Sequence, residues 1–312
     1  MQTQEIVFLD YATLPGYKAE ITAPHHITHY DATTPDQVAE RIKNADIVVS
    51  NKTPITAEMM ASSPNLQLIA VPATGINHLD LQAAEQRGIR IANVRNYGND
   101  TVSEHAMMMI LALMRQLPAY QRDVAAGLWQ QSPLFCHFSA PIHDINGKTL
   151  GIFGKGGIGQ ALAKRAQAFG MNILWGEHKN ATQCRDGYVP FEEVLRQADV
   201  ISLHCPLNEQ TRNMIGENEL KMMKPNAVLI NIGRGGLVDE LALVAALKYG
   251  QLGGAGVDVL TEEPPTHGNP LLKAHLPNLI ITPHMAWGSE EAMQRIYAIL
   301  NANINQFIAD KQ

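Results

Sequence analysis

The sequence has few cysteines, no cluster of basic residues and no long apolar run. Its three cysteines, Cys136, Cys184 and Cys205, are scattered and form no CxxC pair, which argues against a metal site or a disulfide framework. The formal net charge is -6 without any Lys/Arg block, so nothing indicates binding to nucleic acid or to an anionic membrane. The most apolar stretch, AMMMILAL at 106–113, is too short to span a bilayer. We therefore expect a cytoplasmic protein with reduced thiols.

The chain alternates short β-branched runs with amphipathic segments, first over residues 5–94 and again over 148–284. Such alternating βα units predict parallel sheets covered by helices on both faces. The first block has predicted strands at 5–10, 46–51, 66–74 and 89–94, with helices at 36–45, 55–64 and 80–88. The second block has predicted strands at 148–153, 172–176, 199–205, 227–233, 254–260 and 278–284, with helices at 158–169, 191–198, 217–224 and 237–250.

Two segments lie outside this alternation. A long helix from about residue 100 to 116 leads into an aromatic stretch at 118–145, which we call the arm and expect to be irregular. The last segment, from residue 290, is predicted to be a long amphipathic helix whose apolar face must be buried.

The predicted fold class is α/β, with two Rossmann-like domains, parallel sheets and an active-site cleft between them. Because the last helix is expected to pack on the first domain, that domain is predicted to be discontinuous. Residues 1–98 with 286–312 form the predicted substrate-binding domain, and 99–285 the predicted NAD-binding domain.

Residues 154–159 read GKGGIG, which fits the dinucleotide-binding pattern G-x-G-x-x-G. Alone the pattern is weak, but here a predicted strand precedes it and a predicted helix follows it. Gly154 permits the tight turn, Gly156 lets the backbone approach a pyrophosphate, and Gly159 lets the helix pack close to the sheet. The free N–H groups at the helix start then stabilise the negative charge of the phosphates.

Glu177 stands at the end of the next predicted strand. An acid at this position accepts hydrogen bonds from the adenosine ribose and repels a 2′-phosphate, which favours NAD over NADP. His178 and Lys179 follow directly and would weaken that preference, so NADP is kept as an alternative.

Four residues with suitable chemistry stand at or near the ends of predicted strands: Arg234 follows 227–233, Asp258 lies within 254–260, Glu263 follows that strand, and His284 ends 278–284. An arginine can bind a carboxylate with two hydrogen bonds, and a histidine can exchange a proton near neutral pH. A carboxylate hydrogen-bonded to that histidine would orient the ring. Taken singly, each residue could equally be an exposed loop residue or a structural one. Together, at the carboxyl ends of strands in one sheet, they predict an active site.

At these residues the chain resembles the D-isomer-specific 2-hydroxyacid dehydrogenase family. The segments GKTLGIFGKGGIG, NIGRGGLVDE, GVDVLTEEPP and ITPHMAW appear in the family's order over nearly the whole chain. The resemblance implies that Arg234 binds the substrate's carboxylate and carbonyl oxygen, that His284 donates the proton, and that Glu263 pairs with His284. It implies that Asp258 contacts the nicotinamide carboxamide. Further cofactor contacts are implied for Gly157, Ile158, Thr101, His204, Pro206, Ile232 and Gly233.

The family's substrate-binding loop resembles ATGINHLD at 73–80, which implies that Thr74 and Gly75 bind the substrate carboxylate. Asn51 in SNKTPIT and Trp287 in PHMAW are further implied substrate contacts. Among branches of the family, these segments are most similar to glycerate dehydrogenase, also called hydroxypyruvate reductase. The expected reaction is therefore NAD(P)H-dependent reduction of hydroxypyruvate or glyoxylate, or the reverse oxidation, by a homodimer.

Three other functions are left open by the sequence. The chain could act on a different 2-hydroxy acid, or on formate or phosphite, although formate dehydrogenases of this fold carry Gln where Glu263 stands. It could also be an NAD(H)-sensing binding module without turnover. An assay of turnover with 2-oxo acids distinguishes the enzyme from the binding module, because only the enzyme would consume the substrate.

Overall fold

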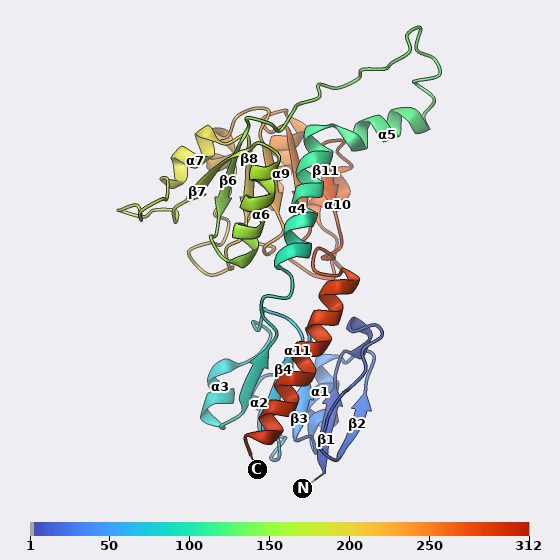
Figure 1. Ribbon diagram of the computed structural model, residues 1–312, viewed down its shortest axis with the longest axis vertical. Helices are drawn as coiled ribbons and strands as arrows, with labels where there is room; N and C mark the ends of the chain where they lie inside the picture. Colours follow the sequence, from blue (N-terminus) through green and yellow to red (C-terminus); the bar gives the residue numbers. More distant parts are fainter. Residues whose placement is uncertain (1–2, 312) are drawn as a thin grey trace. The chain divides into compact units, whose positions relative to one another are not determined.

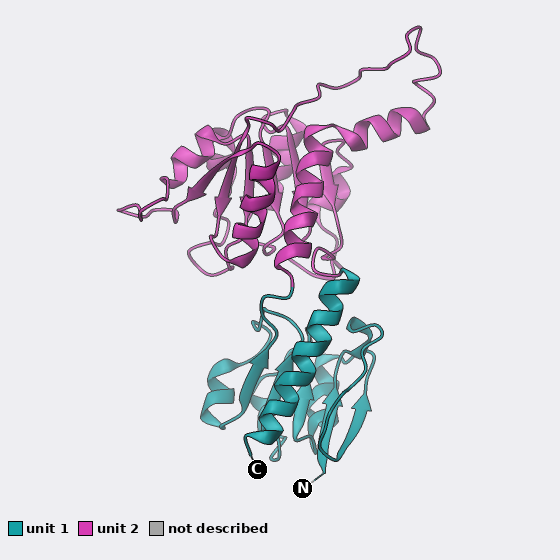
Figure 2. Ribbon diagram, viewed as in Figure 1, with its two compact units in different colours: residues 1–97, 289–312 teal, residues 98–288 magenta. Residues whose placement is uncertain are grey.

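The computed structural model describes residues 3–311 and divides into two compact units (Figures 1 and 2). Unit 1 comprises Met1–Tyr97 together with Ser289–Gln312, and unit 2 comprises Gly98–Gly288. Each unit contains a wholly parallel sheet with helices packed on it. The predicted fold class of two Rossmann-like α/β domains with parallel sheets is confirmed.

Unit 1 has a five-stranded sheet in the order β2-β1-β3-β4-β5. Its strands are β1 (Gln4–Phe8), β2 (His25–His29), β3 (Ile47–Val49), β4 (Leu68–Val71) and β5 (Arg90–Asn93). Its helices are η1 (Tyr11–Thr13), α1 (Pro35–Ile42), α2 (Ala57–Ala61), α3 (Leu81–Gln86) and α11 (Glu290–Ala309), of which α11 packs on β4 and β5.

The edge strand β2 was missing from the sequence prediction. Its sequence, HHITH, is mostly histidine and offers little of the apolar alternation that marks a strand. Pairing with β1, in register from Gln4 opposite His25 to Phe8 opposite His29, is what makes it a strand.

Unit 2 has a six-stranded sheet in the order β11-β10-β9-β8-β6-β7. Its strands are β6 (Thr149–Phe153), β7 (Asn172–Gly176), β8 (Val200–Leu203), β9 (Val228–Asn231), β10 (Gly254–Val257) and β11 (Leu279–Ile281). Its helices are α4 (Asn99–Met114), α5 (Leu117–Ala125), α6 (Gly157–Ala168), α7 (Phe191–Gln197), α8 (Glu217–Met222), α9 (Glu240–Lys248) and α10 (Pro270–Ala274), the last of which was not predicted.

The strand order of unit 2 reverses at β6, which lies between β7 and β8. Ligands of open parallel sheets bind at the carboxyl ends of the strands beside such a reversal. Farther along the same edge, Val257 at the end of β10 is in register with Asn231 at the end of β9 and with Ile281 at the end of β11. The loops that follow β9, β10 and β11 therefore emerge side by side.

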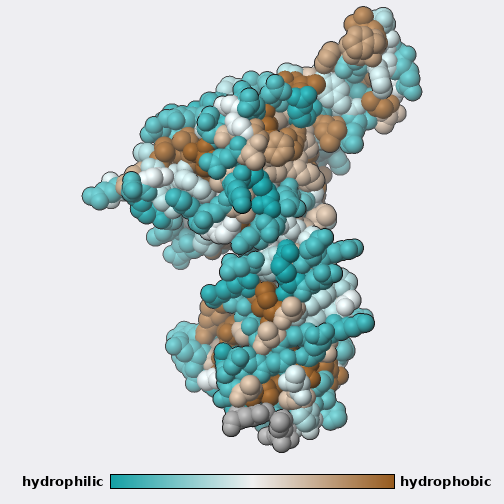
Figure 3. All heavy atoms as spheres, viewed as in Figure 1, coloured by the Kyte–Doolittle hydropathy of each residue, from teal (hydrophilic) through white to brown (hydrophobic). Residues whose placement is uncertain are grey.

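The arm, residues 118–145, is only partly irregular. The structure forms α5 at its start and an extended stretch after it, and the arm projects away from the rest of unit 2 (Figure 1). Several of its apolar side chains face solvent, and Figure 3 shows the brown patches that they make. The most exposed are Phe135 at 92%, Phe138 at 75% and Leu134 at 66%.

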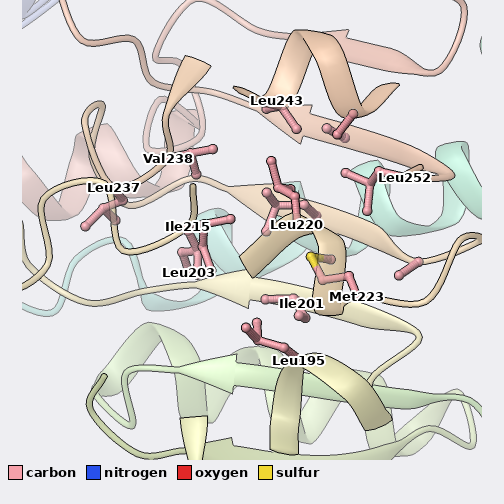
Figure 4. Close-up of a cluster of buried hydrophobic side chains, with 14 of the residues drawn as sticks. Leu195, Ile201, Leu203, Ile215, Leu220, Met223, Leu237, Val238, Leu243 and Leu252 are labelled. Atoms are coloured by element: carbon pink, nitrogen blue, oxygen red, sulfur yellow. The ribbon is translucent and has the colours of Figure 1, made fainter. Parts of the chain in front are cut away.

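The core of unit 2 lies on both faces of its sheet. Within β8, Val200 belongs to the cluster that includes side chains of α4 and α6, whereas its neighbour Ile201 belongs to the cluster of α7, α8 and α9 shown in Figure 4. Every residue of β8 is buried because successive side chains point to opposite, equally covered faces. This packing fixes the strand ends that carry the site.

Residues 3–311 contain no helix that is long and apolar enough to cross a membrane. Nor do their His, Cys, Asp and Glu side chains form a group that could hold a metal ion.

Candidate active site

The glycine loop between β6 and α6 is packed tightly against backbone atoms at two of its positions. Gly154 has φ of +111°, and a Cβ there would lie 2.7 Å from the backbone of His204. At Gly159 a Cβ would lie 2.1 Å from the carbonyl oxygen of Gly154. Glycine is therefore required at both positions by the chain itself.

Gly156 is different, because a Cβ built there would meet nothing within 4 Å. Gly156 is also the N-cap of α6, and no side chain caps this helix end. Gly157 and Ile158 form its first turn, whose backbone N–H groups are suited to an anion. An uncapped helix start beside open space fits the pyrophosphate of a dinucleotide.

Glu177 follows β7 and its side chain is only 3% exposed. Its carboxylate accepts hydrogen bonds from the backbone N–H groups of His178 (2.8 Å) and Arg185 (3.0 Å). It also accepts hydrogen bonds from Nε of Arg185 at 2.9 Å and from Nη2 of the same side chain at 2.6 Å. The Arg185 side chain, followed by the backbone bonds, holds the pKa of Glu177 at about 2, far below its ordinary value of 4.5. Arg185 was not singled out from the sequence because nothing in the motif places it beside the acid.

His204 and Pro206 follow β8, next to the glycine loop. Nε2 of His204 lies 2.9 Å from Oγ of Ser202, and burial lowers the pKa of the imidazole to about 4, so this histidine is neutral at physiological pH. The carbonyl of Pro206 accepts a hydrogen bond from Oγ1 of Thr211 at 2.7 Å, which shapes the loop. Their predicted contacts with the adenine stay predictions.

Glu263 and His284 are in direct contact. Nδ1 of His284 lies 2.6 Å from Oε2 of Glu263, and the other carboxylate oxygen accepts the backbone N–H of Leu260 at 2.8 Å. The His284 backbone has φ of +51°, and its N–H donates to the carbonyl of Asp258 at 2.8 Å. The imidazole is thus oriented through Nδ1, and within residues 3–311 no hydrogen bond is found for its Nε2. The pair can hold and release a proton at Nε2.

The loop of Arg234 follows β9 and packs against the loop of Glu263. A Cβ at Gly235 would lie 1.8 Å from the carbonyl oxygen of Leu260, the residue whose N–H binds Glu263. The buried side chain of Asn231 holds the loop through the N–H of Gly233 (3.2 Å) and the carbonyl of Arg234 (3.0 Å). Nη1 of Arg234 donates to the carbonyl of Gly233 at 2.7 Å, and Ile232 is buried just before it.

Asp258, at the end of β10, is 2% exposed, and its carboxylate organises the segment around His284. It accepts Oγ1 of Thr282 at 2.5 Å and the backbone N–H groups of Met285 and Ala286 at 3.0 Å each. Nε2 of His105 on α4 lies 3.0 Å from Oγ1 of Thr282. Thr282 and His105 were not singled out from the sequence, although Thr282 stands in the ITPHMAW segment, because neither residue by itself indicates a contact with Asp258.

Thr101 and Trp287 both bear on the segment of unit 2 that follows His284. Oγ1 of Thr101 on α4 donates to the carbonyl of Ala286 at 3.2 Å, and Trp287 is partly buried against the core cluster under α4. Both residues therefore help to fix the segment after His284.

In unit 1 the backbone around Asn51 is held by Asp10. The Asp10 carboxylate accepts the N–H groups of Asn51 (2.9 Å) and Lys52 (2.7 Å), and Nδ2 of Asn51 donates to Thr13 at 3.0 Å. In the other predicted loop, Oγ1 of the exposed Thr74 donates to the carbonyl of Val94 at 3.1 Å, and Gly75 is partly exposed. Their predicted contacts with the substrate stay predictions.

These features define a class of protein. A parallel sheet with an uncapped helix start after a glycine loop is the framework of a dinucleotide-dependent enzyme, and the oriented imidazole supplies an acid or base beside it. Residues 107–286 match the family model described as the D-isomer specific 2-hydroxyacid dehydrogenase NAD binding domain. The chain belongs to this family, so the resemblance is confirmed, and the protein is an oxidoreductase that uses NAD(P) and acts on a CH–OH group.

Two curated relatives and one solved structure give the family context. The chain is 47% identical over 310 residues to a glycerate dehydrogenase of Methylorubrum extorquens, covering 99% of this chain and 98% of that one. It is 38% identical over 287 residues to a hydroxypyruvate reductase of Blautia hydrogenotrophica, covering 89% of this chain and 88% of that one. The D-lactate dehydrogenase of Aquifex aeolicus, solved with NAD and lactic acid, superposes with a TM-score of 0.81 at 27% identity over 98% of this chain and 96% of that one.

Proposed function

We propose that the protein reduces a small 2-oxo acid, hydroxypyruvate or glyoxylate, to the D-2-hydroxy acid, and that Arg234, Glu263 and His284 carry the chemistry. The observation on which this depends most is the contact of His284 with Glu263, at the carboxyl edge of the dinucleotide-binding sheet. The named activities of the two curated relatives support this choice of substrate.

In this proposal each residue has one task. Arg234 binds the carboxylate and the carbonyl oxygen with the forked geometry of its guanidinium. His284 gives the proton on Nε2 to that oxygen, and Glu263 keeps the ring oriented through Nδ1. The reduced nicotinamide supplies the hydride to C2. In the oxidative direction His284 takes the proton from the hydroxyl. Asn51, Thr74, Gly75 and Trp287 are further proposed contacts with the substrate.

The test uses two neighbouring Glu–His pairs. His284→Asn removes the proton donor, and we expect kcat/KM to fall by roughly 10²- to 10⁴-fold, the usual share of general acid catalysis. Glu263→Gln should lower kcat as well and change its pH profile. Glu262→Gln is the matched control, because Glu262 contacts His267 at 2.7 Å in an exposed pair. Near-normal turnover of His284→Asn, with the fold intact, would contradict the assignment.

Substrate and activity are tested together by the absorbance of NAD(P)H at 340 nm. A panel of hydroxypyruvate, glyoxylate, pyruvate and bulkier 2-oxo acids should give the highest kcat/KM for the first two. A better rate with a bulky acid would correct the substrate. No turnover of any 2-oxo acid would favour the binding module instead.

We also propose that the protein is a cytoplasmic homodimer that buries the apolar side chains of the arm. Monomeric proteins rarely leave contiguous apolar patches of this kind exposed. Phe135→Ser with Phe138→Ser should shift the protein to monomer in sedimentation, whereas Tyr249→Ser, at a position 79% exposed outside the arm, should not. A dimer that survives the double change would refute the role of the arm.

A further inference from the structure

The loop of residues 177–188 bears on the choice between NADH and NADPH. In the usual arrangement, an acid after the second strand of the nucleotide-binding half faces the ribose and accepts its 2′-hydroxyl, and the same charge repels a 2′-phosphate. Glu177 occupies that position in the sequence, but both oxygens of its carboxylate are already used by Arg185 and the backbone. A carboxylate offers about four acceptor sites, so little capacity is left for a ribose.

The hydrogen-bond acceptor sites of Glu177 are occupied, and its negative charge is neutralised as well. Arg185 forms an ion pair with it at 2.6 Å, and the carboxylate lies beneath the loop surface while the guanidinium side chain is 52% exposed. The group presented to a ligand at the end of β7 is therefore the cation. The sequence motif predicts a negative charge facing the ligand at this place, whereas the structure presents a positive one.

Further basic side chains lie at the same place. The Arg185 guanidinium stacks 3.9 Å from the ring centre of Tyr188, and Nζ of Lys155, from the glycine loop, lies 5.4 Å from that ring. The imidazole of His178 is 70% exposed. Asp186 is the only other acidic residue between 178 and 188, and it is exposed. Lys155 belongs to the turn that fits the pyrophosphate. The adenosine ribose of a bound dinucleotide must lie next to that pyrophosphate, so these basic side chains are close to the expected position of the ribose.

We propose that Arg185, paired with Glu177, and Lys155 form a site for the 2′-phosphate of NADPH, so that the enzyme binds NADPH at least as tightly as NADH. Glu177 then serves to position Arg185 and does not accept the ribose hydroxyls. Arginine and lysine provide charge-assisted hydrogen bonds to a phosphate, and the stacking of both cations on Tyr188 limits their freedom before the ligand arrives. This inference rests on the proposed function only in requiring that a dinucleotide binds to unit 2.

The primary experiment is binding, without turnover. The dissociation constants of NADH and NADPH are measured by nicotinamide fluorescence. The constant for NADH divided by that for NADPH should be about one or larger. Calorimetry with the fragments AMP and adenosine 2′,5′-bisphosphate should show tighter binding of the bisphosphate, by about tenfold, or 1.4 kcal/mol. That advantage should shrink with added salt, because the site is half exposed. NADH binding more tightly than NADPH would overturn the proposal.

Substitutions test whether the charge of Glu177 is neutralised by Arg185 or is free to act on the cofactor. If the acid is already neutralised, Glu177→Gln should change the ratio of the two dissociation constants by less than about threefold, whereas a free acid would give a gain for NADPH of about tenfold or more. Arg185→Gln should weaken NADPH by about tenfold or more and leave NADH binding in place. Arg196→Gln, on the exposed face of α7, is the matched control and should change neither.

Because Arg185→Gln leaves a buried carboxylate unpaired and could unfold the loop, the double variant Glu177→Gln/Arg185→Gln is measured beside it. It lacks both charges, and it should still lose most of the preference for the bisphosphate. A double variant that retains this preference would refute the role of Arg185. Failure of every dinucleotide to bind would instead refute the proposed function, since the parent site itself would be absent.

Discussion

The glycine loop allows fold and cofactor binding to be perturbed separately. At Gly156 a new methyl group would enter open space, and the backbone there, with φ of −80° and ψ of −173°, is allowed for any residue. Alanine should therefore change the free energy of unfolding by less than about 1 kcal/mol, because the lower entropy of the unfolded chain offsets a slightly poorer N-cap. The same methyl group would occupy the space proposed for the pyrophosphate.

At Gly159 the expectation is opposite. A Cβ would lie 2.1 Å from the carbonyl oxygen of Gly154, well inside the 3.4 Å at which ordinary contact begins, so α6 or the Gly154 peptide must move by more than 1 Å. Overpacking of this kind costs about 1–3 kcal/mol. For a unit of this size that corresponds to a melting temperature lower by roughly 2–12 °C.

The assay is thermal unfolding combined with titration of NADH or NADPH by fluorescence. Gly156→Ala should melt like the parent protein and bind either dinucleotide at least about tenfold more weakly, a loss of 1.4 kcal/mol. Gly159→Ala should melt early. If Gly156→Ala binds the cofactor normally, no pyrophosphate lies over this residue, and the reasoning from open space to a phosphate site is wrong.

Two further predictions concern buried groups. Thr282→Val removes the hydroxyl between Asp258 and His105, and we expect a loss of about 1–3 kcal/mol in unfolding free energy together with a lower kcat, both restored by Thr282→Ser. For Glu177, the Arg185 side chain and then the backbone bonds lower the folded-state pKa to about 2 from 4.5, so the stability that this acid contributes is full above pH 4.5 and is lost as the pH falls toward 2. Denaturant titrations over this pH range should show a smaller loss of unfolding free energy for Glu177→Gln than for the parent. An equal loss in the two proteins would contradict the pairing of Glu177 with Arg185.

Local sequence was sufficient to predict most of the fold. The strands β7 and β6 and the helices α6 and α11 follow directly from apolar periodicity bounded by glycine or polar residues. The strand β2 was missed because its residues carry no such pattern, and it exists through pairing with β1. The helix α5 was missed because Pro118 stands in its first turn and none of its residues is buried, so its sequence shows no face that packs on a core.

For the candidate site, sequence identified residue types and the strand ends where they stand, because the carboxyl ends of parallel strands share one edge. It did not give their contacts. The link from Gly235 to Leu260 and on to Glu263, and the hydroxyl of Thr282 between Asp258 and His105, connect residues of different loops.

Glu177 shows most clearly what the sequence determined and what only the tertiary structure decided. Its place after β7 follows from the motif, and the motif alone suggests a carboxylate facing a ribose. The folding of the loop back onto β7 brings Arg185 against the acid and buries the carboxylate. Charge at a binding site depends on which groups are paired and which face the solvent, and that is a property of the folded chain that no local pattern encodes.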